Sequence, residues 1–332
     1  MITREVLERR EFEILSRYAT KATESKGRAL DEKKCAIRTD FQRDRDRIIH
    51  SKAFRRLMHK TQVFLSPEGD HYRTRLTHTI EVSQIARTIA RGAGLNEDLA
   101  EATAMGHDLG HTPFGHSGEA VLNEIYPGGF KHNVQSLRVV DVLESGSEAR
   151  RGMNLTYEVR DGIVNHTGSA VPSTPEGQIV KVSDRIAYIN HDIDDAIRSG
   201  IITAGDLPKD CTEILGSTHK ERIDTLVKDM IQNSLDKPTA QLSEGKTNAM
   251  NKLRTFMFEN VYHNERVKKE EDLDKVRVVI TWLYDYFFKE PSRLPEELLA
   301  MKDEFTAEEL VKDHVAGMTD RYALHFYEIF NK

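Results

Sequence analysis

Apolar residues recur at spacings of three and four along most of the chain, and alternating apolar and polar runs are nearly absent. This spacing places the apolar residues on one face of an α-helix. The pattern predicts an all-α fold with at most a short β-hairpin near residues 61–73, where Ser-Pro-Glu-Gly-Asp separates two short apolar runs. The predicted helices span residues 3–18, 44–59, 73–91, 96–108, 117–125, 132–143, 157–165, 178–198, 212–235, 248–262, 273–288 and 307–330.

The order of these segments predicts three parts. Residues 1–37 form an N-terminal helix and a connecting segment, residues 38–200 a core, and residues 201–332 a C-terminal helical lobe. The loop 167–177, rich in Pro, Gly and Ser, precedes the last helix of the core. The aromatic-rich stretch 276–288 fits either a buried core or a subunit interface.

Composition excludes several classes of protein. The net charge of −6 over 332 residues argues against a basic nucleic-acid coat protein and against a polyanionic tail. The first residues carry frequent charges and no apolar core of a signal peptide. The longest apolar stretch is interrupted by Arg277 and Asp285 and is too short to cross a bilayer. With two cysteines far apart, we expect a soluble cytoplasmic protein without a membrane partner.

Two local biases change this picture. Residues 38–75 hold ten Lys and Arg against five Asp and Glu, although the chain as a whole is acidic. Such a patch favours a local anion site, for instance for a polyphosphate. Eight of the fourteen histidines fall between His50 and His132. Clustering alone is also compatible with surface or core-capping histidines.

The segment from His107 to Glu119 favours a metal and acid–base site. His107 and Asp108 are adjacent at a helix end, followed by His111, a Gly/Pro turn, and the pair His116 and Glu119 three residues apart on a new helix. Imidazole together with carboxylate suits a borderline divalent metal rather than calcium. A structural cap would account for one of these polar groups, but not for five.

Two helices contribute further candidates. His78 lies on the apolar face that Val82 and Ile85 define, where a lone histidine is usually a satisfied core residue. In residues 178–198, Asp184, Tyr188 and Asp192 follow one another at intervals of four, apart from the isoleucine stripe. A solvated face with Arg185 in a local ion pair is the simpler explanation. It fits Tyr188 poorly, because its ring favours partial burial.

Taken in chain order, His78, His107-Asp108 and Asp184 resemble the ligand set of the HD-domain metal phosphohydrolases. Further motifs are similar to the dGTPase branch of that superfamily, the deoxynucleoside triphosphate triphosphohydrolases. These motifs are Arg-Asp-Arg-Asp-Arg-Ile-Ile-His-Ser at 43–51, Ala-Phe-Arg-Arg-Leu at 53–57, Lys-Thr-Gln-Val-Phe at 60–64 and Tyr-Arg-Thr-Arg-Leu-Thr-His-Thr at 72–79. The resemblance covers roughly residues 35–200 and implies the helical HD fold.

The resemblance also implies a role for each matching position. The metal ligands would be His78, His107, Asp108 and Asp184, holding Mg²⁺, Mn²⁺ or another transition metal. His116 with Glu119 would be the acid/base pair beside the α-phosphate, and His111 a second histidine there. The implied substrate contacts are Arg75 and Arg185 for the triphosphate, Gln62, Tyr188 and Asp192 for the deoxyribose, and His132 as a further active-site histidine.

The implied activity is metal-dependent hydrolysis of dGTP or other dNTPs to deoxynucleoside and inorganic triphosphate. A homo-oligomer is implied as well, and a nucleotide activator or single-stranded DNA are further candidate partners. One alternative is another HD phosphohydrolase that acts on nucleoside monophosphates, cyclic dinucleotides or alarmones. Another is a nucleotide sensor or single-stranded nucleic-acid binder with a vestigial metal site.

Overall fold

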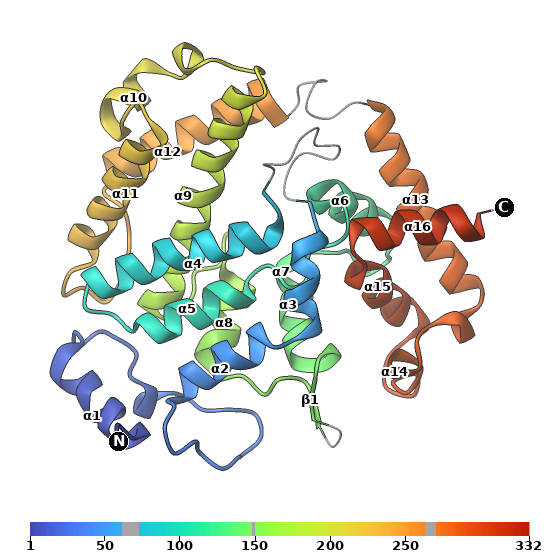
Figure 1. Cartoon of the computed structure of the whole chain (residues 1–332), viewed down its shortest axis with the longest axis horizontal. Coiled ribbons are helices and arrows are strands. Elements are labelled where there is room, and N and C mark those ends of the chain that lie inside the picture. The colour runs from blue at the N-terminus through green and yellow to red at the C-terminus, as the bar shows by residue number, and fades with distance from the viewer. Residues whose placement is uncertain (62–72, 148–149, 263–269, 332) are drawn as a thin grey trace.

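The computed structural model describes residues 1–61, 73–147, 150–262 and 270–331, and within this part the all-α prediction is confirmed (Figure 1). The helices of the N-terminal half are α1 Arg4–Ile14, α2 Asp40–Ile49, α3 Lys52–Arg56, α4 Arg75–Gly92, α5 Glu97–Gly106, α6 Gly115–Ile125, α7 His132–Arg138, α8 Tyr157–Asn165 and α9 Pro175–Arg198. Those of the C-terminal half are α10 Lys209–Leu215, α11 His219–Ser234, α12 Glu244–Met257, α13 Glu270–Lys289, α14 Glu296–Leu299, α15 Ala307–Gly317 and α16 Asp320–Phe330.

Short helical turns link several of these helices. The 3-10 turns are η1 Ala22–Glu24, η2 Leu57–His59, η4 Ala204–Asp206 and η6 Pro291–Arg293, and the π-helical turns are η3 Val139–Leu143 and η5 Phe258–Tyr262. None of the helices in the described ranges is both long and apolar enough to span a membrane.

Helices α4, α5 and α9 pack against one another at the centre of the molecule (Figure 1). Side-chain caps fix where they begin. Thr74 accepts a hydrogen bond from the Thr77 amide at the start of α4, Asn96 caps α5, and Thr174 caps α9. Their apolar faces form one hydrophobic cluster with α11 and α12. This packing brings the C-terminal end of α5 close to both α4 and α9.

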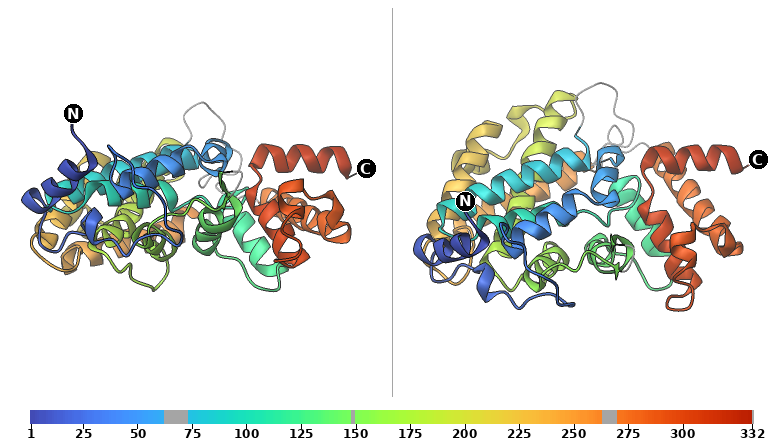
Figure 2. Two further views of the ribbon diagram at one scale, coloured as in Figure 1. Left: turned by 90° about the horizontal axis from the view of Figure 1, so that it is seen from below. Right: turned by 60° about the horizontal axis from the view of Figure 1, so that its bottom comes forward.

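The remaining helices form two further clusters. Helices α2, α3, α5 and α8 enclose one, and α6 packs with α13, α15 and α16 around the other. Helices α10–α12 lie on the side of α9, whereas α13–α16 lie at the opposite end of the molecule from α1 (Figure 2). The aromatic stretch of α13 is therefore largely core, with Tyr284 and Phe287 buried and Phe288 exposed. The three-part domain division stays a prediction.

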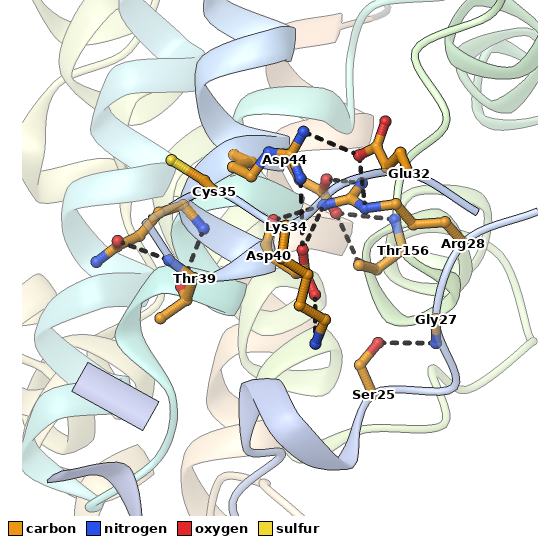
Figure 3. Close-up of polar contacts among 12 residues, drawn as sticks. Ser25, Gly27, Arg28, Glu32, Lys34, Cys35, Thr39, Asp40, Asp44 and Thr156 are labelled. Carbon is orange, nitrogen blue, oxygen red and sulfur yellow. Dashed lines mark hydrogen bonds and ion pairs between the residues drawn. The ribbon is translucent and has the colours of Figure 1, made fainter. Parts of the chain in front are cut away.

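A polar network ties the N-terminal segment to the core (Figure 3). The Arg28 guanidinium contacts the buried carboxylate of Asp44 and donates to the carbonyls of Asp40 and Asn154. The amide and hydroxyl of Thr156 donate to the other Asp44 oxygen at 2.8 and 2.7 Å. Segments that are distant in sequence are thereby joined at a single buried carboxylate.

The predicted hairpin near residues 61–73 falls almost entirely outside the described residues, although its flanking residues Thr61 and Thr74 form an antiparallel bridge. A different pair of short strands is present, β1 Ser145–Ser147 and β2 Arg150–Arg151. Three predicted helices are divided. The helix predicted at residues 44–59 consists of α2, which already begins at Asp40, followed by α3 and η2. The helix predicted at 212–235 is interrupted at Gly216, whose φ is 114°. The helix predicted at 307–330 is interrupted between α15 and α16.

Candidate metal and phosphate site

Four predicted ligands from three helices converge at the end of α5. His78 comes from α4, His107 and Asp108 follow α5 directly, and Asp184 comes from α9. His78 Nε2 lies 3.0 Å from Asp184 Oδ1 and 4.0 Å from Asp108 Oδ2. His107 Nε2 lies 3.5 Å from Asp108 Oδ1 and 3.9 Å from Asp184 Oδ1. We call these four residues the metal quartet.

The donor chemistry of the metal quartet fits a divalent cation. His107 Nδ1 donates to the Ala104 carbonyl at 2.7 Å, so Nε2 carries the lone pair that faces the other ligands. This buried Nε2 has no hydrogen-bond partner within the described ranges. Burial opposes ionisation of Asp108, yet His107, His111 and Arg75 hold its pKa well below the ordinary value. Despite its burial, the hydrogen bond from His78 lowers the pKa of Asp184 to about 2.

Beside the metal quartet lies a second group, formed by His111, His116, Glu119 and His132, which we call the histidine cluster. Helix α6 places His116 and Glu119 on one face, with His116 Nδ1 3.0 Å from Glu119 Oε2. The side chain of His116 is 62% exposed and accessible to a substrate. His111 stacks on His132 with ring centroids 4.0 Å apart, and its Nε2 lies 3.3 Å from Asp108 Oδ1.

His132 donates from both ring nitrogens. Its Nδ1 lies 2.9 Å from Glu119 Oε1, and its Nε2 lies 3.3 Å from the Nε2 of His166. Because His166 Nδ1 donates to the Ile163 carbonyl, its Nε2 must accept. Burial disfavours the His132 cation, but the hydrogen bond and charge of Glu119 outweigh it and raise the pKa of His132. Within the histidine cluster, Glu119 therefore favours the cationic form of His132.

The sequence did not single out His166. It caps the C-terminal end of α8, and its ring makes an edge contact with His107 at 5.0 Å. Burial lowers the pKa of His166 to about 3, so it is neutral at physiological pH. Its position at a helix end, like that of His107, was the available sequence signal.

The two arginines expected at the triphosphate differ in surroundings. Arg75, the first residue of α4, is buried and donates to Asp108 Oδ2 at 2.9 Å. Arg185 follows Asp184 on α9, is half-buried, and has no ion pair with any residue that the structure describes. The local ion pair considered for Arg185 is therefore not found there.

The expected deoxyribose contacts lie further along α9. Tyr188 is half-buried and Asp192 is buried, and Gln62 lies outside the described residues. The hydroxyl of Tyr262, in η5, donates to Asp192 Oδ2. Burial raises the pKa of Asp192 to about 7 despite this bond. Tyr262 was missed because its sequence position at a helix end gives no hint of a partner on α9.

The basic stretch 38–75 is distributed over two places. Arg75 reaches the metal quartet, whereas Arg38, Arg47, Arg55 and other cations line a cavity of about 1110 Å³ between α2, α3 and the α15–α16 region. Among the described residues, the members of the metal quartet do not line this cavity. Several of its cations are already paired; Arg38, for example, lies 2.6 Å from Asp46. The link between this patch and the substrate triphosphate stays a prediction.

Comparison with known proteins places these residues in a family context. The HD domain family matches residues 75–189, and the phosphohydrolase-associated domain family matches residues 240–329. A deoxyguanosinetriphosphate triphosphohydrolase-like protein of Caldanaerobacter subterraneus is 58% identical over 99% of this chain and 96% of its own. A protein of the same name from Desulfatibacillum aliphaticivorans is 48% identical over 99% of this chain and 97% of its own.

Solved structures support the fold. A phosphohydrolase from Bacteroides thetaiotaomicron superposes with a TM-score of 0.53 at 16% sequence identity, covering 86% of this chain and 68% of that one. At this identity the likeness concerns the fold alone.

Proposed function

This chain belongs to the family of deoxyguanosinetriphosphate triphosphohydrolase-like proteins and carries their HD domain, and from this premise we propose that it hydrolyses deoxynucleoside triphosphates to deoxynucleoside and inorganic triphosphate. The observation that carries the proposal is that the metal quartet lies against the histidine cluster. His111 links the two groups, because it contacts both Asp108 and His132. Such an arrangement suits phosphate ester hydrolysis, in which a charged phosphorus centre and a leaving oxygen need separate partners.

The metal quartet would hold the divalent ion, which supplies Lewis-acid polarisation of the α-phosphate when bound. The residues around it have tasks of their own. We assign Arg75, Arg185 and His132 to the neutralisation of charge on the triphosphate; Arg75 already contacts Asp108 of the metal quartet, and Glu119 favours the cationic form of His132. We assign His116 the delivery of a proton to the leaving 5′-oxygen. Its ring is exposed and Glu119 holds Nδ1, so Nε2 is the nitrogen left for the substrate.

The sugar would be read along α9. Asp192 can accept a hydrogen bond from the 3′-hydroxyl, while Tyr262 holds the carboxyl in place. The ring of Tyr188, one helical turn earlier, offers no partner to an added 2′-hydroxyl. Gln62 is proposed as a second contact to the 3′-hydroxyl. A ribonucleotide should then lose roughly 1–3 kcal/mol of binding relative to the deoxy form, or about one to two decades in specificity.

Product analysis tests the proposal directly. Purified protein is incubated with each dNTP, singly and mixed, and with GTP, in the presence of Mg²⁺ or Mn²⁺, and the products are resolved by ion exchange. We expect deoxynucleoside and inorganic triphosphate in equal amounts, with GTP cleaved at least about tenfold more slowly than dGTP. Release of orthophosphate or pyrophosphate instead would contradict the proposal and favour another HD phosphohydrolase activity. Equal cleavage of GTP and dGTP would contradict the sugar filter.

A further inference from the structure

The C-terminal helices reach the turn that carries the proposed acid/base histidines. Helix α16 begins beside α6 (Figure 1), and its first residue, Asp320, bonds two separate segments. Asp320 Oδ1 accepts from the Phe114 amide at 2.9 Å, and Oδ2 accepts from the Thr61 amide at 2.9 Å and from the Thr61 hydroxyl. One carboxylate thereby joins two segments, at Thr61 and at Phe114, to the C-terminal lobe.

Phe114 needs such a partner. It lies between His111 and His116, and its φ of 62° puts a bulky residue in the left-handed region. That conformation is strained for a bulky side chain and persists only where the surroundings enforce it. Phe114 is also the N-cap of α6 and provides no side-chain cap. Its buried ring packs with α13, α15 and α16, so the same lobe holds both the ring and the amide of Phe114.

A second link runs in parallel. The buried ammonium of Lys60 donates to the Ala316 carbonyl at 2.9 Å and to the His111 carbonyl. Ala316 is near the end of α15, four residues before Asp320, and Lys60 directly precedes Thr61. The junction of α15 and α16 is therefore joined to residues 60–61 and, directly or through Lys60, to the backbone at Phe114 and His111.

We propose that Asp320 is a positioning residue for the reaction proposed above, on which this inference rests. It holds the turn 111–116 at a fixed place relative to Thr61, so that the rings of His111 and His116 keep their position beside the metal quartet. Asp320 acts through the Phe114 and Thr61 backbone and need not touch the substrate. A misplacement of about 1 Å in such a turn can reduce turnover by about 100-fold.

Variants at both ends of the contact test this role. Asp320→Asn retains one acceptor oxygen, so it cannot serve Phe114 and Thr61 together. Thr61→Val removes the hydroxyl contact alone and keeps the side-chain shape. Asp303→Asn is the matched control, since Asp303 is exposed and makes no hydrogen bond or ion pair within the described part of the chain. Each variant is assayed for kcat, KM, bound Mn²⁺, thermal unfolding and amide hydrogen exchange at Phe114.

We expect Asp320→Asn to lower kcat by about 10- to 100-fold while KM and Mn²⁺ content stay within about threefold, and to speed exchange at Phe114 by at least about tenfold. Thr61→Val should do the same to a smaller extent, and it decides the matter if Asp320→Asn does not fold. Asp303→Asn should match the wild type.

Three results would overturn the inference. The first is unchanged exchange at Phe114, the second is faster exchange with unchanged kcat, and the third is a loss of kcat that only follows the unfolded fraction. If the wild type releases no triphosphate, the proposed reaction fails and this role in it fails as well, while the exchange data still decide whether Asp320 holds the turn. The two failures are thus distinguishable.

Discussion

At the residue scale, Glu119 organises the histidine cluster. Its carboxylate accepts hydrogen bonds from Nδ1 of His116, at 3.0 Å, and from both the amide and Nδ1 of His132. Although burial opposes ionisation, these hydrogen bonds hold the pKa of Glu119 well below its ordinary value. Glu119 is therefore a carboxylate at neutral pH and orients both rings.

His116→Ala should retain metal and nucleotide but lower kcat by about 10²- to 10⁴-fold, because the leaving 5′-oxygen loses its proton donor. Steady-state kinetics with dGTP, together with Mn²⁺ titration, measures both. Glu119→Gln should give a smaller loss of the same kind, because the amide still orients the ring. Loss of nucleotide binding with unchanged kcat at saturation would assign His116 to binding instead.

Asp108→Asn should abolish high-affinity metal binding. The amide keeps the shape and a hydrogen-bond acceptor for Arg75, but the carboxylate charge that the metal quartet offers is lost. Calorimetric titration with Mn²⁺ should show affinity lower by more than about 100-fold, since changes even outside the ligand shell cost 10- to 100-fold. Circular dichroism should remain that of the wild type. Full turnover by a metal-free Asp108→Asn protein would refute the metal quartet.

Asp192 makes stability depend on pH. Burial raises its pKa to about 7, so between pH 4 and 7 the unfolded chain releases this proton before the folded protein does. The contribution of Asp192 is therefore largest below about pH 4 and is lost as the pH rises to about 7. Urea unfolding in the presence of EDTA should show that the free energy of unfolding of the wild type is lower at pH 8 than at pH 5. In Asp192→Asn this decrease should be smaller by on the order of 1–3 kcal/mol. The same fall in both proteins would exclude Asp192 as its source.

At the element scale, α7 is hydrogen-bonded to the loop that follows α5. Ser136 Oγ accepts from the Gly110 amide at 2.9 Å and donates to the His107 carbonyl at 2.7 Å. A Cβ on Gly110 would lie 2.1 Å from the Ser136 nitrogen and 2.5 Å from the His132 oxygen. This close approach places His132 beside the metal quartet.

Gly110→Ala should therefore displace α7 and with it His132. We expect destabilisation of about 1–3 kcal/mol, as for other overpacked sites, and a lower kcat. Gly245→Ala in α12 is the matched control, because a Cβ there meets nothing within 4 Å, and it should be neutral or stabilising by about 0.5–1 kcal/mol. Thermal unfolding and turnover of both variants decide the point. Wild-type behaviour of Gly110→Ala would show that the loop can yield.

Helix boundaries were the weaker part of the sequence interpretation. The spacing of apolar residues identified the helical segments, but the positions at which one helix ends and the next begins depend on N-capping residues. Helix α11 begins at a capping box formed by Thr218 and Glu221. Helix α16 begins at Thr319, whose side chain accepts a hydrogen bond from the Tyr322 amide. Both caps lie inside stretches that were predicted to be continuous helices. Both threonines are visible in the sequence. A threonine within a periodic helix, however, is compatible with either a cap or an exposed helical position.

At the scale of the whole molecule, Asp44 anchors residues 1–37 to the core. Asp44→Ala should destabilise the protein by about 3–5 kcal/mol, the usual cost of removing one partner of a buried ion pair, because Arg28 and Thr156 lose their acceptor. Asp31→Ala, at an exposed position in the same segment, is the control and should change the free energy of unfolding by less than about 0.5 kcal/mol. Equal urea midpoints for the two variants would contradict this role of Asp44.

The packing of the C-terminal half bears on how the lobe acts. Residues 201–262 pack on α4 and α9 and supply Tyr262, whereas residues 270–331 pack on α6 and supply Asp320. Both parts of the C-terminal half therefore contact residues of the proposed active site. The homo-oligomer, the nucleotide activator and single-stranded DNA stay predictions.

The sequence by itself determined the helical class, because the helical period fixes which residues share a face. The candidate ligands in chain order came from the resemblance of His78, His107-Asp108 and Asp184 to the HD-domain phosphohydrolases. The alternation of apolar and polar residues carries no information on which faces meet. The partners of Asp192 and Phe114 lie 70 and 206 residues away, and only the packing of α12 and α16 brings Tyr262 and Asp320 to them. The tertiary structure likewise decided that Arg75 faces the metal quartet while other cations of the same basic stretch line a separate cavity, since neighbouring helices turn their side chains to different sides of the core.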